Sequence, residues 1–180
     1  LRRLRTEAEE FEDAGLFEPG SADLVRANLS AAATLAEAVA DADLIEEAVL
    51  ERPEVKGPVL SSIEQAARPD AVIGTNTSTI PIGDLAGSLT HRERFLGIHF
   101  SNPAPFIPGV ELIAHSSTDE AAVQTAELLV ARTGKLSASV TDPAGCVLNR
   151  LQPVLRREAV SLAQQHILKP VEHEPSRVVD

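Results

Sequence analysis

The chain has 180 residues, a formal net charge of −11 at pH 7 and a hydrophobic fraction of 43%. That length suffices for one full domain, or for one domain and part of another, and the apolar fraction predicts a packed core. The acidic charge without a basic stripe argues against nucleic-acid binding, and no apolar run approaches the roughly 20 residues of a membrane span. The single cysteine excludes an intramolecular disulfide and leads us to expect a cytoplasmic protein.

The N-terminal part of the chain is expected to be helical. Apolar residues recur at helical spacing from Leu1 to Phe11, and Gly15 with the segment 18–20 ends that helix. Ser21 is predicted to cap a short second helix. The Ala-rich segment 30–40 is ambiguous between helix and loop.

From residue 44 onward, short strands alternate with helices. The apolar runs that we predict to be strands are residues 44–50, 71–75, 95–100, 110–113 and 136–140. Between them, helices are predicted over 53–67, over 81–89 and after the capping-box pattern at 117–120, the last one ending at Gly134. This alternation predicts an α/β fold with a mostly parallel sheet.

Two prolines qualify the helical predictions. Pro58 lies inside the helix predicted for 53–67, so the regular helix is expected to start only there, because proline lacks a backbone N–H. The segment 141–145 is a natural domain boundary. A helical run from 146 to about 165 follows it, and we expect an interruption at Pro153.

Polar side chains collect where the predicted strands end. Ligands of open α/β sheets bind beyond the carboxyl ends of the strands. Glu51 and Lys56 follow the first strand, residues 76–79 follow the second, and His99 ends the third with Asn102 just beyond it. Taken singly, each has an ordinary structural explanation, such as a turn, a helix cap or a core histidine. Their joint position at one edge of the sheet is what indicates a site.

Five stretches resemble the 3-hydroxyacyl-CoA dehydrogenase family, whose members include L-gulonate 3-dehydrogenase (lambda-crystallin) and carnitine dehydrogenase. The matching stretches are residues 43–51 with Lys56, 75–78, 97–103, 110–112 and 147–152, in the order that the family has. The resemblance covers most of the chain. The pairing of Asn-Thr-Ser with His-Phe-x-Asn-Pro is far more specific than a lone glycine-rich motif.

The resemblance implies catalytic roles for four residues. His99 corresponds to the general base that removes the proton of the 3-hydroxyl group, a task that suits imidazole because its unperturbed pKa is about 6.5. Glu111 corresponds to the carboxylate that holds the other ring nitrogen. Ser78 and Asn149 correspond to the residues that hydrogen-bond the reacting oxygen.

The resemblance also implies NAD as the cofactor, with contacts from Glu51, Lys56, Asn76 and Asn102. No residues are assigned to a metal. The implied architecture is an incomplete Rossmann-type parallel sheet over residues 1–141, followed over 142–180 by the start of an all-helical C-terminal domain. Family members open with Gly-x-Gly-x-x-Gly, whereas no two of the ten glycines here have Gly-x-Gly spacing. We therefore expect the first βαβ unit to be missing.

The implied reaction is the NAD-dependent oxidation of a 3-hydroxyacyl-CoA to a 3-ketoacyl-CoA in fatty acid metabolism. One alternative is a related free hydroxy acid, such as gulonate or carnitine, as the small-molecule substrate. The other is a catalytically silent, truncated remnant that acts at most as a binding module, which the missing glycine motif favours. Full-length members of the family are expected to be homodimers, and that expectation is left open for this chain.

Overall fold

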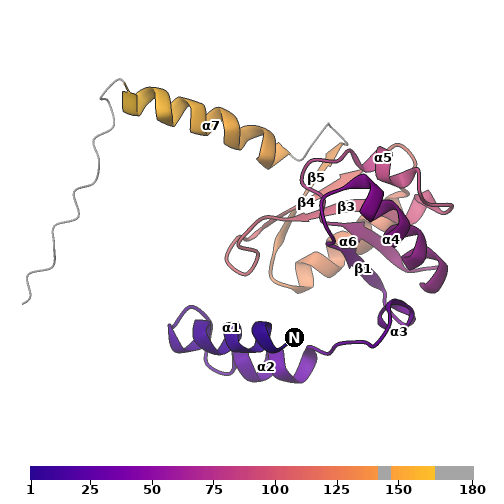
Figure 1. Ribbon diagram of the computed structural model, residues 1–180, viewed down its shortest axis with the longest axis horizontal. Coiled ribbons are helices and arrows are strands. Elements are labelled where there is room, and N and C mark those ends of the chain that lie inside the picture. The colour runs from indigo at the N-terminus through magenta and orange to yellow at the C-terminus, as the bar shows by residue number, and fades with distance from the viewer. Residues whose placement is uncertain (142–146, 165–180) are drawn as a thin grey trace, which may run out of the picture.

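The computed structural model describes residues 1–141 and 147–164. A five-stranded sheet with helices on both faces forms the centre, preceded by a helical hairpin and followed by one long helix (Figure 1). Most of the strands are parallel. The α/β class predicted from the alternating pattern is therefore confirmed.

The sheet has its strands in sequence order. They are β1 (Leu44–Glu47), β2 (Val72–Thr75), β3 (Phe95–Phe100), β4 (Gly109–Ala114) and β5 (Leu136–Thr141). β1, β2 and β3 run parallel to one another, β4 is antiparallel to β3, and β5 is parallel to β4. β1 is shorter than the predicted 44–50, because its ladder with β2 ends where Glu47 pairs with Thr75.

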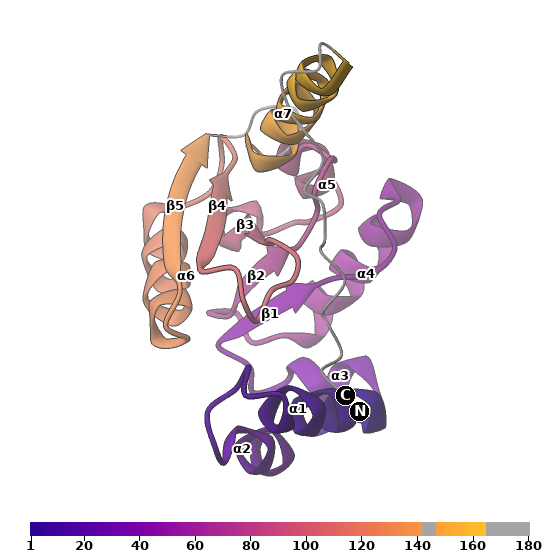
Figure 2. The same cartoon turned by 90° about the vertical axis from the view of Figure 1, so that its left-hand side faces the viewer.

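Helices cover both faces of this sheet. On one face, α4 (Pro53–Ala66) and α5 (Ile82–Ala86) pack against residues such as Ile45, Ile73 and Phe95. On the other face, α6 (Glu120–Arg132) packs against Leu96, Ile98 and Leu112. Figure 2 shows α4 and α6 on opposite sides of the sheet. This two-sided burial explains why β2 and β3 are apolar along almost their whole length.

The N-terminal hairpin consists of α1 (Arg2–Asp13) and α2 (Ser21–Asn28), and α3 (Leu35–Val39) leads into the sheet. The prediction that Ser21 caps α2 is wrong, since the N-cap residue is Gly20, which has a φ of 91°. The carboxylate of Glu12 takes over the capping function. It accepts hydrogen bonds from the backbone N–H groups of Gly20 at 2.9 Å and Ala22 at 2.8 Å.

The start of α6 also differs from the prediction. Its N-cap is Asp119, which makes no side-chain cap, so the predicted capping box at 117–120 is wrong. Thr118 is engaged elsewhere, because its hydroxyl accepts from the N–H of His115 and donates to the carbonyl of Phe95. The predicted end of α6 is confirmed, since Gly134 follows with a φ of 76°.

Neither proline interrupts its helix. α4 begins at Pro53, in the first turn, where the fixed φ of proline favours a helix and its missing N–H costs nothing. The helix then continues through Pro58. The long helix α7 (Val147–Gln164) likewise passes Pro153 without a break. The predicted start at Pro58 and the predicted interruption at Pro153 are therefore wrong.

The segment between β3 and β4 joins the hairpin to the sheet. The ring of Phe106 lies 5.3 Å from that of Phe11 and 5.9 Å from that of Phe17, measured between centroids. From the other side, the ammonium group of Lys135 donates to the carbonyls of Ala104 and Ile107. This segment begins two residues after His99, so these contacts hold the chain next to that residue.

Candidate active site

His99 and Glu111 form a buried pair at the centre of the site. The two residues are direct partners in the antiparallel ladder between β3 and β4. Nδ1 of His99 lies 2.8 Å from Oε2 of Glu111, and the residues are 4% and 8% exposed. Opposed residues on neighbouring strands project to the same face, which is why the pair forms without help from a loop.

The hydroxyl group of Ser78 lies on the other side of the imidazole ring. Ser78 belongs to the segment between β2 and α5, and its Oγ is 3.2 Å from Nε2 of His99. In the tautomer with its proton on Nδ1, the ring donates that N–H to the carboxylate of Glu111. Nε2 is then left as the acceptor. The arrangement therefore presents a base whose reactive nitrogen faces a hydroxyl group.

Glu51 anchors the turn that carries Ser78. Its Oε1 accepts a hydrogen bond from the Thr77 hydroxyl at 2.6 Å, and others from the backbone N–H groups of Ser78 at 2.8 Å and Thr79 at 2.9 Å. Partial burial raises the pKa of the Glu51 carboxyl, but these bonds and the charge of Lys56 outweigh it and lower the pKa to about 2. The carboxylate is thus ionised at neutral pH.

Lys56 lies in a buried ion pair next to Glu51. The residue is 1% exposed, and its Nζ lies 2.9 Å and 3.1 Å from the two carboxylate oxygens of Glu47. The same Nζ is 3.4 Å from Oε2 of Glu51. Glu47 also accepts a hydrogen bond from the Thr75 hydroxyl at 2.7 Å. This network ties the carboxyl ends of β1 and β2 to the first turns of α4.

The asparagines of the predicted site take different positions. Asn76 ties the end of β2 to β3, since its Oδ1 accepts from the N–H of Phe100 at 2.8 Å. Its amide nitrogen has no partner among the described residues. Asn102 is exposed in the segment after β3. Asn149 lies on α7, and the placement of its side chain is outside the described part of the structure.

The structure thus brings six predicted residues to one edge of the sheet, namely Glu51, Lys56, Asn76, Ser78, His99 and Glu111. Sequence reasoning missed Glu47 and counted Thr77 among the polar residues 76–79 without giving it a role, and both hold this group together. A charged residue within an otherwise apolar strand was the available signal for Glu47, because buried charges are rarely unpaired. Thr77 looked like an ordinary turn residue.

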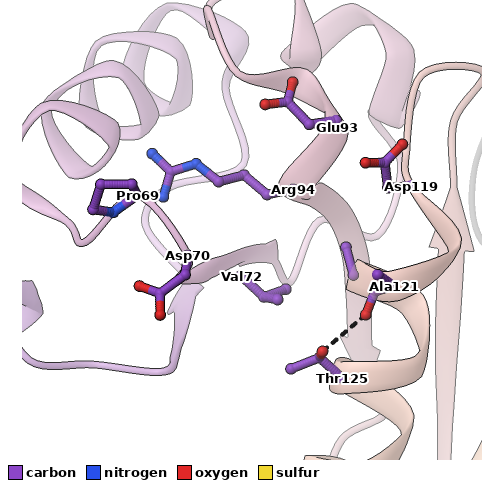
Figure 3. A pocket seen from close by; sticks show the side chains of 9 residues that line it. Pro69, Asp70, Val72, Glu93, Arg94, Asp119, Ala121 and Thr125 are labelled. Atoms are coloured by element: carbon purple, nitrogen blue, oxygen red, sulfur yellow. Dashed lines mark hydrogen bonds between the residues drawn. The ribbon is translucent and has the colours of Figure 1, made fainter.

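A separate cavity of about 190 Å³ is lined by residues at the beginning of β2 and just before β3 (Figure 3), and neither His99 nor Glu111 belongs to its lining. It is lined by three carboxylates, those of Asp70, Glu93 and Asp119, and by Arg94. The guanidinium of Arg94 donates to backbone carbonyls, including that of Ala71 at 3.1 Å. It also donates to the carbonyl of Glu64 at 3.4 Å, so Arg94 holds the end of α4 against the sheet, and we assign the cavity no ligand.

Comparisons with known proteins agree on one family. A family model described as 3-hydroxyacyl-CoA dehydrogenase, NAD binding domain, matches residues 1–143. The fatty acid oxidation complex subunit alpha of Idiomarina loihiensis is 41% identical over 117 residues, which cover 65% of this chain and 16% of that protein.

Solved structures resemble the chain over nearly its whole length. The crystal structure of FadB2 from M. tuberculosis matches with a TM-score of 0.83 and 30% identity, covering 93% of this chain and 59% of that one. The 3-hydroxybutyryl-CoA dehydrogenase of Escherichia coli K12 matches with a TM-score of 0.81 and 26% identity, covering 94% and 36%. The chain thus spans only part of each relative.

Among the described residues, no helix has the length and apolar character to cross a membrane.

Proposed function

The chain belongs to the family of 3-hydroxyacyl-CoA dehydrogenase NAD-binding domains, and we propose that it supplies the catalytic base for oxidation of a 3-hydroxyacyl-CoA to a 3-ketoacyl-CoA. Membership confirms the family resemblance seen in the sequence and NAD as the family's cofactor. The observation that carries the proposal is the line of three groups, in which Nε2 of His99 is 3.2 Å from Ser78 and Nδ1 is 2.8 Å from Glu111.

Each of the three groups has a distinct task in this reaction. A substrate hydroxyl that lies beside the Ser78 hydroxyl is within reach of Nε2 of His99, and Nε2 accepts the proton of the substrate. The carboxylate of Glu111 fixes the ring orientation and stabilises the imidazolium that forms. Ser78 then donates a hydrogen bond to the substrate oxygen. Bound NAD supplies the hydride acceptor.

The residues at this edge of the sheet fit the nicotinamide half of the cofactor. Asn76, after β2, has an amide nitrogen without a partner among the described residues, and Asn102, in the segment after β3, is exposed. Uncharged amides suit a carboxamide and ribose hydroxyl groups. No Gly-x-Gly spacing occurs in the sequence, so we assign no residue of this chain to the pyrophosphate.

We base the proposed substrate class on the names of the relatives. Matches named for fatty acid oxidation and for 3-hydroxybutyryl-CoA support an acyl-CoA over gulonate or carnitine. We propose residues 1–141 as part of a Rossmann-type domain and 142–180 as the beginning of a helical domain, in which Asn149 faces the same substrate. Homodimerisation of this chain and its location in the cytoplasm stay predictions.

The first test is a calorimetric titration of NADH into the chain. We expect saturable binding that Asn76→Ala weakens, whereas Asn28→Ala, an exposed asparagine on α2, leaves it unchanged. Consumption of NADH with acetoacetyl-CoA, compared with gulonate-type and carnitine-type substrates, then tests the reaction. Absence of saturable NADH binding would contradict a cofactor site formed by these residues.

A further inference from the structure

We infer that Glu51 is a positioning residue, which holds the turn at 77–79 so that the Ser78 hydroxyl lies next to Nε2 of His99. We also infer that Lys56 holds Glu51 in place. The inference rests on the proposed function, because it assigns Glu51 and Lys56 a task within the same site. It differs from the cofactor contacts that the family resemblance implied for both residues.

The first argument is that Oε1 of Glu51 is fully used within the chain. Besides the hydroxyl of Thr77 and the two backbone N–H groups, it accepts from the Thr79 hydroxyl at 3.1 Å. A carboxylate oxygen offers about two lone-pair sites. Four donors around Oε1 leave that oxygen no capacity for a ligand hydroxyl, while Oε2 of this partly exposed carboxylate lies 3.4 Å from Lys56.

The second argument concerns the ammonium group of Lys56, which has three N–H donors. Three carboxylate oxygens surround it, two from Glu47 at 2.9 Å and 3.1 Å and one from Glu51 at 3.4 Å. With 1% of the residue exposed, no donor faces solvent. The role of Lys56 is therefore to hold Glu51 against a buried anchor.

That anchor is rigid because Glu47 belongs to β1. Its carboxylate also accepts from the N–H of Val49 at 2.6 Å and from the hydroxyl of Thr75 at 2.7 Å. Low dielectric around a fully satisfied buried network strengthens each of its bonds. The position of Glu51 is thus defined relative to the ends of both β1 and β2.

Asn76, which precedes the turn, is held by hydrogen bonds that do not involve Glu51. Its N–H donates to the carbonyl of Glu47 at 2.8 Å, and its Oδ1 accepts from the N–H of Phe100. The N–H groups of Ser78 and Thr79 depend on Glu51. Without the carboxylate, these two amides lose this acceptor, and we expect the Ser78 hydroxyl to shift relative to Nε2 of His99. A preorganised donor stabilises developing charge far better than a mobile one.

The test records the ¹⁵N NMR signals of the His99 ring in the cofactor-free chain. Ser78→Ala removes the partner of Nε2 and sets the reference shift of that nitrogen. We expect Glu51→Ala to reproduce most of this shift, and the double variant to add little more. Glu51→Gln keeps one acceptor oxygen and is expected to give a smaller shift. Glu54→Ala, on the exposed first turn of α4, is the matched control and leaves the signal unchanged.

Two outcomes overturn the inference. One is an unshifted Nε2 signal in Glu51→Ala while Ser78→Ala shifts it, which is what a residue serving only the cofactor predicts. The other is no shift in Ser78→Ala itself. Should Glu51→Ala not fold, faster hydrogen exchange at the amides of Ser78 and Thr79 in Glu51→Gln supports the inference, and unchanged exchange contradicts it. Since no cofactor or substrate is present, failure of the proposed reaction leaves this result intact.

Discussion

Glu111 faces His99 directly across the β3–β4 ladder, and their side chains meet at 2.8 Å on the α5 side of the sheet. The pairing exists because the register of this antiparallel ladder sets the two residues opposite each other. A register shift of one residue would send the two side chains to opposite faces. The orientation of the base is therefore set by the register of the sheet itself.

The first prediction concerns the base. In a protein that contains this chain and turns over 3-hydroxyacyl-CoA, His99→Gln is expected to lower kcat by about 10²–10⁴-fold or more. The affinity for NADH should stay close to the parent value, since His99 binds Ser78 and Glu111. His91→Gln, at an exposed histidine, serves as the control for both measurements. Wild-type kcat in His99→Gln would remove His99 from the reaction.

The second prediction concerns the carboxylate behind the ring. Glu111→Gln keeps the shape of the side chain but loses the charge that stabilises the imidazolium. We expect kcat to fall by about 10²-fold or more while KM changes little, because the effect is greatest in the transition state. Glu120→Gln, exposed at the start of α6, is the control. A rise in KM at constant kcat would instead point to a role in substrate binding.

The third prediction concerns the free energy of unfolding. Lys56→Met leaves the buried carboxylate of Glu47 without its partner and is expected to cost about 3–5 kcal/mol. Combining it with Glu47→Leu should recover much of that loss, since the fully buried carboxylate is then gone and Glu51 is partly exposed to water. Arg3→Met breaks an exposed ion pair and should cost about 1 kcal/mol or less. Urea unfolding measures the free energy of unfolding of all three variants. Equal losses in Lys56→Met and Arg3→Met would contradict a stabilising role of the buried pair.

The fourth prediction concerns pH. Both carboxyl oxygens of Glu46 are buried without a hydrogen-bond partner among the described residues. Burial, aided by the nearby charge of Glu47, raises the pKa of Glu46 from 4.5 to about 9. A carboxyl group with a raised folded-state pKa leaves stability intact below its unfolded pKa. Stability is then lost as pH rises toward the folded value, by at most about 1.4 kcal/mol per pH unit.

Glu46→Gln is neutral at every pH and should remove this loss. Its free energy of unfolding is therefore expected to exceed that of the parent by a margin that grows from about pH 5 to about pH 8. Glu10→Gln, at an exposed position on α1, should show no such growth. A constant difference between Glu46→Gln and the parent across this range would mean that the carboxyl is not buried in its neutral form.

Local patterns in the sequence were sufficient for the class of fold and for most elements. The apolar runs at 71–75 and 95–100 predicted β2 and β3 closely, because a strand buried on both faces must be apolar at nearly every position. The motif residues at strand ends were likewise visible, since the carboxyl edge of parallel strands is a general place for ligands. His99 and Ser78 were named on that ground and on the family resemblance.

Only the tertiary structure decided which groups bind one another. Glu12, rather than Ser21, satisfies the free N–H groups at the start of α2. Glu47, inside a strand, is the partner of Lys56, and one carboxylate oxygen of Glu51, Oε1, binds the turn of Ser78. These contacts join residues from different elements. Their existence depends on strand order and side-chain direction, which hydrophobic periodicity does not encode.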